Sequence, residues 1–189
     1  MADAVPVSPP PVVIIMGVSG AGKTTVATAL AQHSGAALIE GDDCHDAASR
    51  ARMSAGIPLD GADRWPWLDR IVAAIAAARH ESPVIATCSA LRCSYRDHLR
   101  QRVIAPLRFV FLDPDRALLA ARVAQRASHF MPPALLASQI ATLEPPVDEG
   151  DVLWLRGSEP LDAILADWRG AGRGGVDWGV TPADRAGIR

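Results

Sequence analysis

The chain has 189 residues, a formal net charge of -2 and 49% hydrophobic residues, which together predict one folded domain with a substantial core. Its 19 basic and 21 acidic side chains lack the basic excess that is typical of nucleic-acid-binding proteins. The 3 cysteines form no C-x-x-C pair and cannot all be joined within one chain. This usage favours a reducing, cytoplasmic compartment.

The two ends of the sequence differ from the stretch between them. Residues 1–11 are rich in proline and lack the charged and apolar regions of a signal peptide, so we expect a flexible arm. Residues 170–189 begin with a glycine-rich stretch without periodicity, and we expect a flexible tail there. Apolar stretches fall well short of the ~20 residues that cross a bilayer. The sequence therefore predicts neither a membrane nor a nucleic acid as partner.

Short apolar runs alternate with helix-like stretches across a predicted domain of residues 12–169. We expect strands at 12–16, 37–39, 83–87, 107–112 and 152–155, and helices at about 23–33, 66–80, 93–103, 115–127, 133–143 and 159–169. This alternation predicts an α/β fold in which helices cover both faces of a parallel sheet. Residues 54–67 lack periodicity and are interpreted as a loop. The break at 128–133 predicts a lid over about 122–138.

The strongest motif runs from Gly17 to Thr24 and matches G-x-x-x-x-G-K-[ST] at every fixed position. Glycines let successive backbone N–H groups point at phosphate oxygens, and the following helix favours an anion at its N-terminus. Lys23 is expected to reach the β- and γ-phosphates of ATP, and the Thr24 hydroxyl to hold Mg²⁺. The predicted ATP-binding residues of this loop are Gly17, Val18, Ser19, Gly20, Ala21, Gly22, Lys23, Thr24 and Thr25. An incidental glycine turn is the alternative, but the apolar strand before the motif and the helix after it favour nucleotide binding.

Acidic residues follow the second predicted strand. Ligands of open parallel sheets bind outside the carboxyl ends of the strands, so Glu40 and Asp42 are expected beside the phosphate loop. Glu40 is a candidate ligand of Mg²⁺, directly or through water. Asp42 is a candidate base that orients and deprotonates an attacking hydroxyl. The alternative is a solvated acidic turn. Since the chain is short and has no Asn-Lys-x-Asp guanine signature, a kinase for a small metabolite is favoured.

Arginines near the strand ends predict an acidic acceptor. Arg64, Arg92 and Arg96 are candidates for binding its carboxylate, because a guanidinium pairs with a carboxylate through two parallel hydrogen bonds. Arg122 and Arg126 lie four residues apart and so share one helix face. They are expected to bind ATP, and Arg126 to act on the γ-phosphate from a lid. Surface ion pairs are the alternative for each of these arginines.

Several blocks in order resemble the gluconokinases of the small P-loop type. They are Gly17–Thr25, Gly41-Asp42-Asp43-x-His45, Met53-Ser54-x-Gly56-Ile57-Pro58-Leu59, Asp63-Arg64-x-Pro66-Trp67-Leu68, Cys88-Ser89-Ala90-Leu91-Arg92-x-x-Tyr95-Arg96-Asp97, His129-Phe130-Met131 and Ser138-Gln139-x-Ala141-Thr142-Leu143-Glu144. The resemblance covers about residues 12–168. Four positions depart from the family pattern, namely Asp46, Ser49, Arg52 and Ser128, and most of them fall on the acceptor side.

The resemblance implies ATP-dependent phosphorylation of D-gluconate to 6-phosphogluconate. It also implies a three-layer fold like that of shikimate and adenylate kinases, with a five-stranded parallel sheet, a helical lid and often a homodimer. It places His45 and His129 on the acceptor side. Two alternatives stay open from the residues themselves: a kinase for another small hydroxy acid, and a nucleotide-binding regulator without turnover.

Overall fold

The computed structural model describes residues 11–79, 82–125 and 133–156. The strands are β1 (Val12–Met16), β2 (Ala37–Ile39), β3 (Val84–Thr87), β4 (Leu107–Asp113) and β5 (Val152–Arg156). The helices are α1 (Lys23–Ser34), α2 (Ala47–Ser54), α3 (Gly61–Ala78), α4 (Cys93–Arg102), α5 (Arg116–Gln125) and α6 (Pro133–Thr142), with a short 3₁₀ helix η1 (Gly41–Cys44).

The strands form one five-stranded sheet in the order β2-β3-β1-β4-β5, and every pair is parallel. This confirms the α/β fold with a five-stranded parallel sheet. β1 lies at the centre, with Ile15 paired to Thr87 of β3 on one side and to Val110 of β4 on the other. Because all strands run the same way, the loops after β1, β2 and β3 meet at one edge of the sheet.

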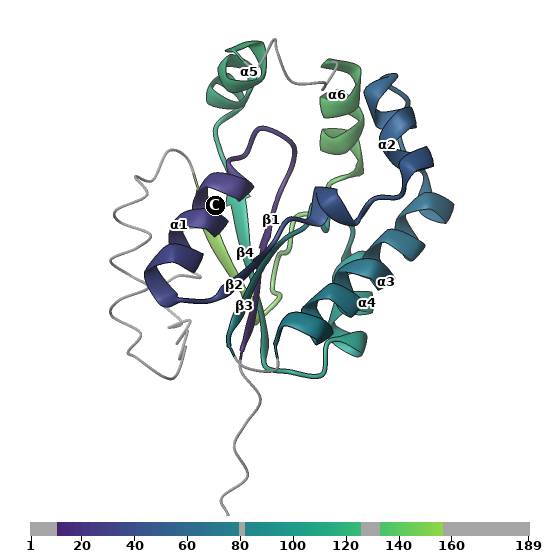
Figure 1. Cartoon of the computed structure of the whole chain (residues 1–189). Coiled ribbons are helices and arrows are strands. Elements are labelled where there is room, and N and C mark those ends of the chain that lie inside the picture. Colours follow the sequence, from purple (N-terminus) through teal and green to yellow (C-terminus); the bar gives the residue numbers. More distant parts are fainter. Residues whose placement is uncertain (1–10, 80–81, 126–132, 157–189) are drawn as a thin grey trace, which may run out of the picture.

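Helices cover both faces of the sheet, so the fold has three layers (Figure 1). The alternating side chains of β1 show why. Ile14 packs with α3 and α4 residues such as Ile71 and Leu99, whereas Ile15 packs with α1 residues such as Leu30. All five residues of β1 are buried. The strand therefore reads as a continuous apolar run, which is typical of a strand enclosed from both sides.

The segment after β2 differs from the prediction in two ways. α2 was not expected, and α3 begins at Gly61 inside the stretch that was interpreted as a loop. Side-chain caps explain both helices better than apolar periodicity does. Asp46, a departure from the family pattern, accepts a hydrogen bond from the Ser49 backbone N–H at the start of α2. Asp60 and Asp63 form a reciprocal capping box that starts α3 ahead of Pro66.

Some predictions fall on residues outside the described ranges. They are the N-terminal arm up to residue 10, the centre of the lid at 126–132, the helix at 159–169 and the tail at 170–189. Within the described ranges, no helix is long and apolar enough to cross a membrane.

Candidate active site

The loop between β1 and α1 has the backbone that its glycines predict. Gly17, Gly20 and Gly22 have φ angles of 138°, 82° and 99°, which side chains other than glycine rarely adopt. A Cβ at Gly17 would also lie 2.7 Å from the carbonyl oxygen of Leu112. Gly22 is the N-cap of α1, so the loop delivers its backbone N–H groups directly to a helix N-terminus. The loop is thus shaped as a cradle for an anion.

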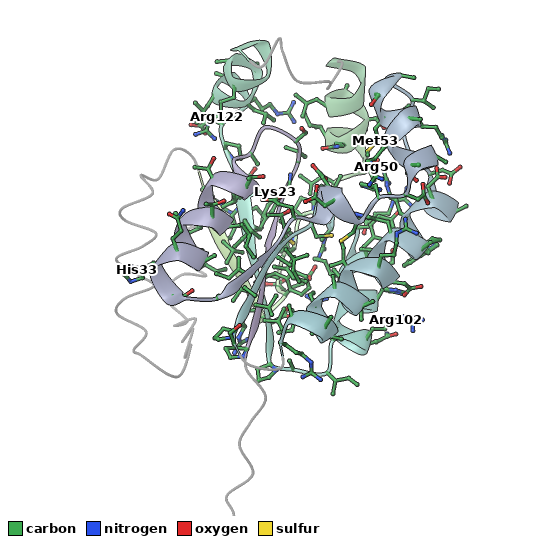
Figure 2. All side chains as sticks on the ribbon, viewed as in Figure 1. Lys23, His33, Arg50, Met53, Arg102 and Arg122 are labelled. Atoms are coloured by element: carbon green, nitrogen blue, oxygen red, sulfur yellow. The ribbon has the colours of Figure 1, made fainter. Side chains whose placement is uncertain are left out.

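Two cations lie at this loop. Lys23 opens α1, and its Nζ donates to the carbonyl oxygen of Val18 at 3.0 Å. Arg122 of α5 donates through Nη1 to the carbonyl oxygen of Ala21 at 3.3 Å. Figure 2 shows Lys23 at the upper end of α1 and Arg122 below α5, above the same end of the sheet. The positive charges that phosphate binding needs are therefore on both sides of the loop.

A threonine and a glutamate meet beside the loop and fit Mg²⁺. The Thr24 hydroxyl donates to Glu40 Oε2 at 3.3 Å, and the Thr87 hydroxyl donates to the same oxygen at 2.8 Å. Glu40 Oε1 is buried and has no hydrogen-bond partner among the described residues. A carboxylate oxygen and a hydroxyl are hard ligands of the type that Mg²⁺ uses together with phosphates. No cluster of three His, Cys, Asp or Glu side chains offers a protein-only metal site in the described part of the chain.

Asp42 is held in place by the buried glycine before it. The Gly41 N–H donates to the Thr87 hydroxyl at 3.0 Å, and Trp67 Nε1 donates to the Gly41 carbonyl oxygen at 2.6 Å. A Cβ at Gly41 would lie 2.1 Å from the Thr87 carbonyl oxygen, so only glycine fits between η1 and β3. Both neighbours of Gly41 in the chain, Glu40 and Asp42, are positioned by this attachment.

Asp42 faces a cavity that it shares with the phosphate loop. The cavity is lined by Ser19, Lys23, Asp42, His45, Met53, Pro58, Leu59, Arg64, Trp67, Ser89, Leu91, Ser138 and Gln139. A phosphate-loop lysine and a strand-end aspartate therefore line one space, with α2 and its Met53 on the far side (Figure 2). This arrangement can bring a hydroxyl next to a phosphoryl group.

His45 is buried in the wall of this cavity. Its ring stacks on Trp67 with centroids 4.6 Å apart and planes 6° apart. Burial lowers the pKa of His45 below its usual value, and the charge of Asp42 opposes this shift only in part. Burial therefore favours the neutral form of the imidazole. Its Nδ1 is buried without a hydrogen-bond partner among the described residues.

The three arginines predicted to bind an acidic acceptor have different environments. Arg64 lines the cavity, and its guanidinium donates to the Tyr95 hydroxyl at 3.4 Å. Arg92 is exposed, with its guanidinium carbon 5.9 Å from the centre of the same Tyr95 ring. It is not among the described residues that line the cavity. Of the three predicted arginines, Arg64 is the one that lines the cavity.

Arg96, the third of these arginines, is bonded within the protein and does not line the cavity in the described part of the chain. Its side chain is 1% exposed, and its Nε lies 2.8 Å from Glu149 Oε2, with Nη2 2.5 Å from Glu149 Oε1. Its Nη1 donates to the carbonyl oxygen of Ala90 at 3.0 Å. All three nitrogens are bound within the protein. Arg96 instead fixes the loop after β3, in which Ala90 has a strained φ of 43°.

Some cavity residues had no predicted role in the sequence. Ser138 and Gln139 lie on α6, far along the chain from the phosphate loop, and Ser89 follows β3. Thr87, which organises Glu40 and Gly41, resembles any other polar residue at a strand end. Ser89, Ser138 and Gln139 occur in blocks of the family pattern, and this was the one signal that could have identified them. Arg126 and His129 lie outside the described residues.

Comparison with known proteins agrees with this geometry. The model of a family described as an AAA domain matches residues 12–146. The gluconokinase of Gluconobacter oxydans (strain 621H) is 43% identical over 162 residues, which cover 84% of this chain and 89% of that protein. The thermosensitive gluconokinase of Escherichia coli (strain K12) is 43% identical over 143 residues, or 74% and 75% of the two chains.

Solved structures are similar over the same region. A gluconokinase from Sinorhizobium meliloti 1021 has a TM-score of 0.74 and 42% identity, and the match covers 85% of this chain and 90% of that one. An unliganded sugar kinase from Janibacter sp. HTCC2649 has a TM-score of 0.76 and 38% identity, covering 86% and 93%. Fold and sequence similarity thus extend over most of each relative.

Proposed function

The chain belongs to the gluconokinase family, and on that premise we propose that it transfers the γ-phosphoryl group of ATP to a hydroxyl of D-gluconate, giving 6-phospho-D-gluconate. The observation that carries this proposal is the shared cavity, in which Lys23 of the phosphate loop and Asp42 face one space. Arg64 on the same wall supplies a cation for an acidic acceptor. A phosphate cradle alone would fit any P-loop protein, so the acceptor side makes the difference.

The residues divide the reaction between them. The loop N–H groups and Lys23 bind the β- and γ-phosphates and spread the charge that develops during transfer. Asp42 accepts a hydrogen bond from the acceptor hydroxyl, aligns its oxygen with the γ-phosphorus and takes up its proton as the new P–O bond forms. Arg64 pairs with the acceptor carboxylate. The Arg122 guanidinium at the loop adds positive charge on the ATP side.

Thr24 and Glu40 are the residues that would hold Mg²⁺, with Thr87 orienting the glutamate. A bound Mg²⁺ would neutralise negative charge on the ATP phosphates during transfer. The buried and unpartnered Glu40 Oε1 supports this assignment. The remaining expectations belong to the same proposal: a homodimer, by family resemblance, and a cytoplasmic location. Three free cysteines, one of them buried, support a reducing compartment.

The test is ADP release from MgATP with a panel of sugar acids, measured against an ATP-only background. We expect release with gluconate and much slower release with other aldonates and shikimate. Release with another acid and none with gluconate would replace the proposed acceptor. If the protein binds ATP but no acid gives ADP release, the alternative of a nucleotide-binding regulator without turnover would be favoured. Omitting Mg²⁺ is expected to abolish turnover, which tests the requirement for the metal.

A further inference from the structure

A side chain of α6 is bonded to the phosphate loop. The backbone N–H of Ser19 donates to Gln139 Oε1 at 2.6 Å, across 120 positions of sequence. Both residues line the cavity that contains Lys23 and Asp42. Because a backbone N–H can only donate, the amide oxygen of Gln139 must be the atom that faces Ser19. The bond therefore fixes which way the amide group points.

The bond leaves the other half of the amide for a ligand. A glutamine amide carries two N–H donors on Nε2 in addition to its oxygen. With the oxygen committed to Ser19, the Nε2 group is the part of Gln139 that can serve a molecule in the cavity. Gluconate has hydroxyl and carboxylate oxygens, all of which can accept hydrogen bonds. The chemistry of Nε2 thus matches an oxygen-rich acid.

The position of Gln139 is fixed by the packing of its helix. Leu136 and Ile140 of α6, together with Leu143 directly after the helix, pack against the core on the α1 side of the sheet. Just after the helix, the Glu144 backbone N–H donates to the Leu91 carbonyl oxygen at 2.8 Å. The Glu144 carboxylate also accepts from the Cys93 backbone N–H at 2.7 Å. α6 is therefore attached to the loop after β3, whose residues Ser89 and Leu91 line the same cavity.

We propose that Gln139 is a specificity-determining residue of the acceptor site, which donates from Nε2 to an oxygen of the sugar acid while Ser19 of the phosphate loop holds its Oε1. This inference rests on the proposed function. It adds a direct link between the acceptor site and the ATP loop, because one side chain contacts both. The residue also gives the enzyme a way to distinguish acceptors by the position of one oxygen atom.

The test uses two variants with opposite chemistry at the same site. Gln139→Ala removes both the oxygen and the donors. Gln139→Glu keeps an oxygen that accepts from Ser19 but replaces the donors with a negative oxygen. We expect Gln139→Ala to raise the KM for gluconate roughly 10- to 100-fold with a smaller change in kcat, as for a lost hydrogen bond to a charged group. Gln139→Glu is expected to raise it at least as much, because the new carboxylate repels an acid. The Kd of an ATP analogue should change less than about threefold in Gln139→Glu.

A matched control separates local chemistry from general charge effects. Ala141 is an exposed residue of the same helix, so Ala141→Glu adds the same charge away from the cavity. It should leave the KM for gluconate within about twofold of wild type. If Gln139→Glu keeps a wild-type KM, Gln139 only braces the phosphate loop and the proposal is overturned. The acceptor used is whichever acid wild type phosphorylates, so failure of gluconate itself would count against the proposed function and not against Gln139.

Discussion

Removal of the negative charge of Glu149 is expected to destabilise the protein strongly, although Glu149 does not line the cavity. Its carboxylate is the ion-pair partner of Arg96, whose side chain is 1% exposed, and it also binds Arg100 at 2.5 Å. In Glu149→Gln, Arg100 keeps its bonds to Asp97 and Asp151. Arg96 keeps its hydrogen bond to the Ala90 carbonyl oxygen, but its bonds to residue 149 lose their charge. The variant therefore leaves a buried guanidinium without its counter-charge.

The size of the effect follows from that burial. Removing one member of a buried ion pair costs ~3–5 kcal/mol. Because glutamine retains one oxygen as an acceptor, we expect a loss of ~2–3 kcal/mol in the free energy of unfolding. For a chain of this length, 1 kcal/mol corresponds to ~2–4 °C in Tm, so Tm should fall by roughly 4–12 °C. The control is Asp69→Asn, since the Asp69 side chain is 55% exposed in its pairs with His98 and Arg102. Exposed pairs contribute ~0–1 kcal/mol.

Thermal and urea unfolding at pH 7 measure the difference. The double variant Arg96→Met, Glu149→Gln should regain part of the loss, because it removes the unpaired charge. Burial raises the pKa of Glu149, but hydrogen bonds from Arg96 and Arg100 outweigh it, so the pKa lies below its usual value. Wild type should therefore lose stability as pH falls below about 4.5, and Glu149→Gln should lose less over that range. Equal losses of unfolding free energy for Glu149→Gln and Asp69→Asn at pH 7 would show that the buried ion pair of Arg96 contributes no more than an exposed one.

Three further predictions follow from the site. Gly41→Ala should lower Tm by several degrees and reduce turnover, because a Cβ would lie 2.1 Å from a carbonyl oxygen of β3. In Gly150→Ala a Cβ would meet nothing within 4 Å, so thermal unfolding should give the wild-type Tm. Asp42→Asn should keep ATP-analogue binding and lose ~10²–10⁴ in kcat, whereas Asp43→Asn should stay within a few-fold of wild type, so equal rates for the two variants would exclude Asp42 as the base. Because burial lowers the pKa of His45, the contribution of this residue to stability is complete above about pH 6.5 and declines as pH falls through its lower folded pKa. The free energy of unfolding should therefore depend less on pH between 7 and 5 in His45→Asn than in wild type. The same pH dependence in both proteins would contradict this assignment.

Local patterns were sufficient for much of the fold. β1, β3, α1 and α4 lie within one or two residues of their predicted bounds. For the two strands the reason is that a strand enclosed on both faces needs an uninterrupted apolar run. The turn after β2 was harder. α2 is stabilised by the Asp46 side chain and has one buried residue, Ser49, so it leaves no apolar stripe in the sequence. Capping, rather than hydrophobic periodicity, was the signal that mattered there.

The phosphate loop could be predicted from local sequence, because its glycines, lysine and threonine act on residues next to them in the chain. The partners of side chains that are far apart in the chain follow from packing and could not be predicted in this way. Arg96 and Arg64 look alike in the sequence, yet Arg96 pairs with Glu149 across 53 positions and Arg64 lines the cavity. Gln139 likewise reaches Ser19 only after α6 packs on the sheet. Charged and amide side chains are long and take whichever partner packing brings within hydrogen-bond reach, and no local pattern records that choice.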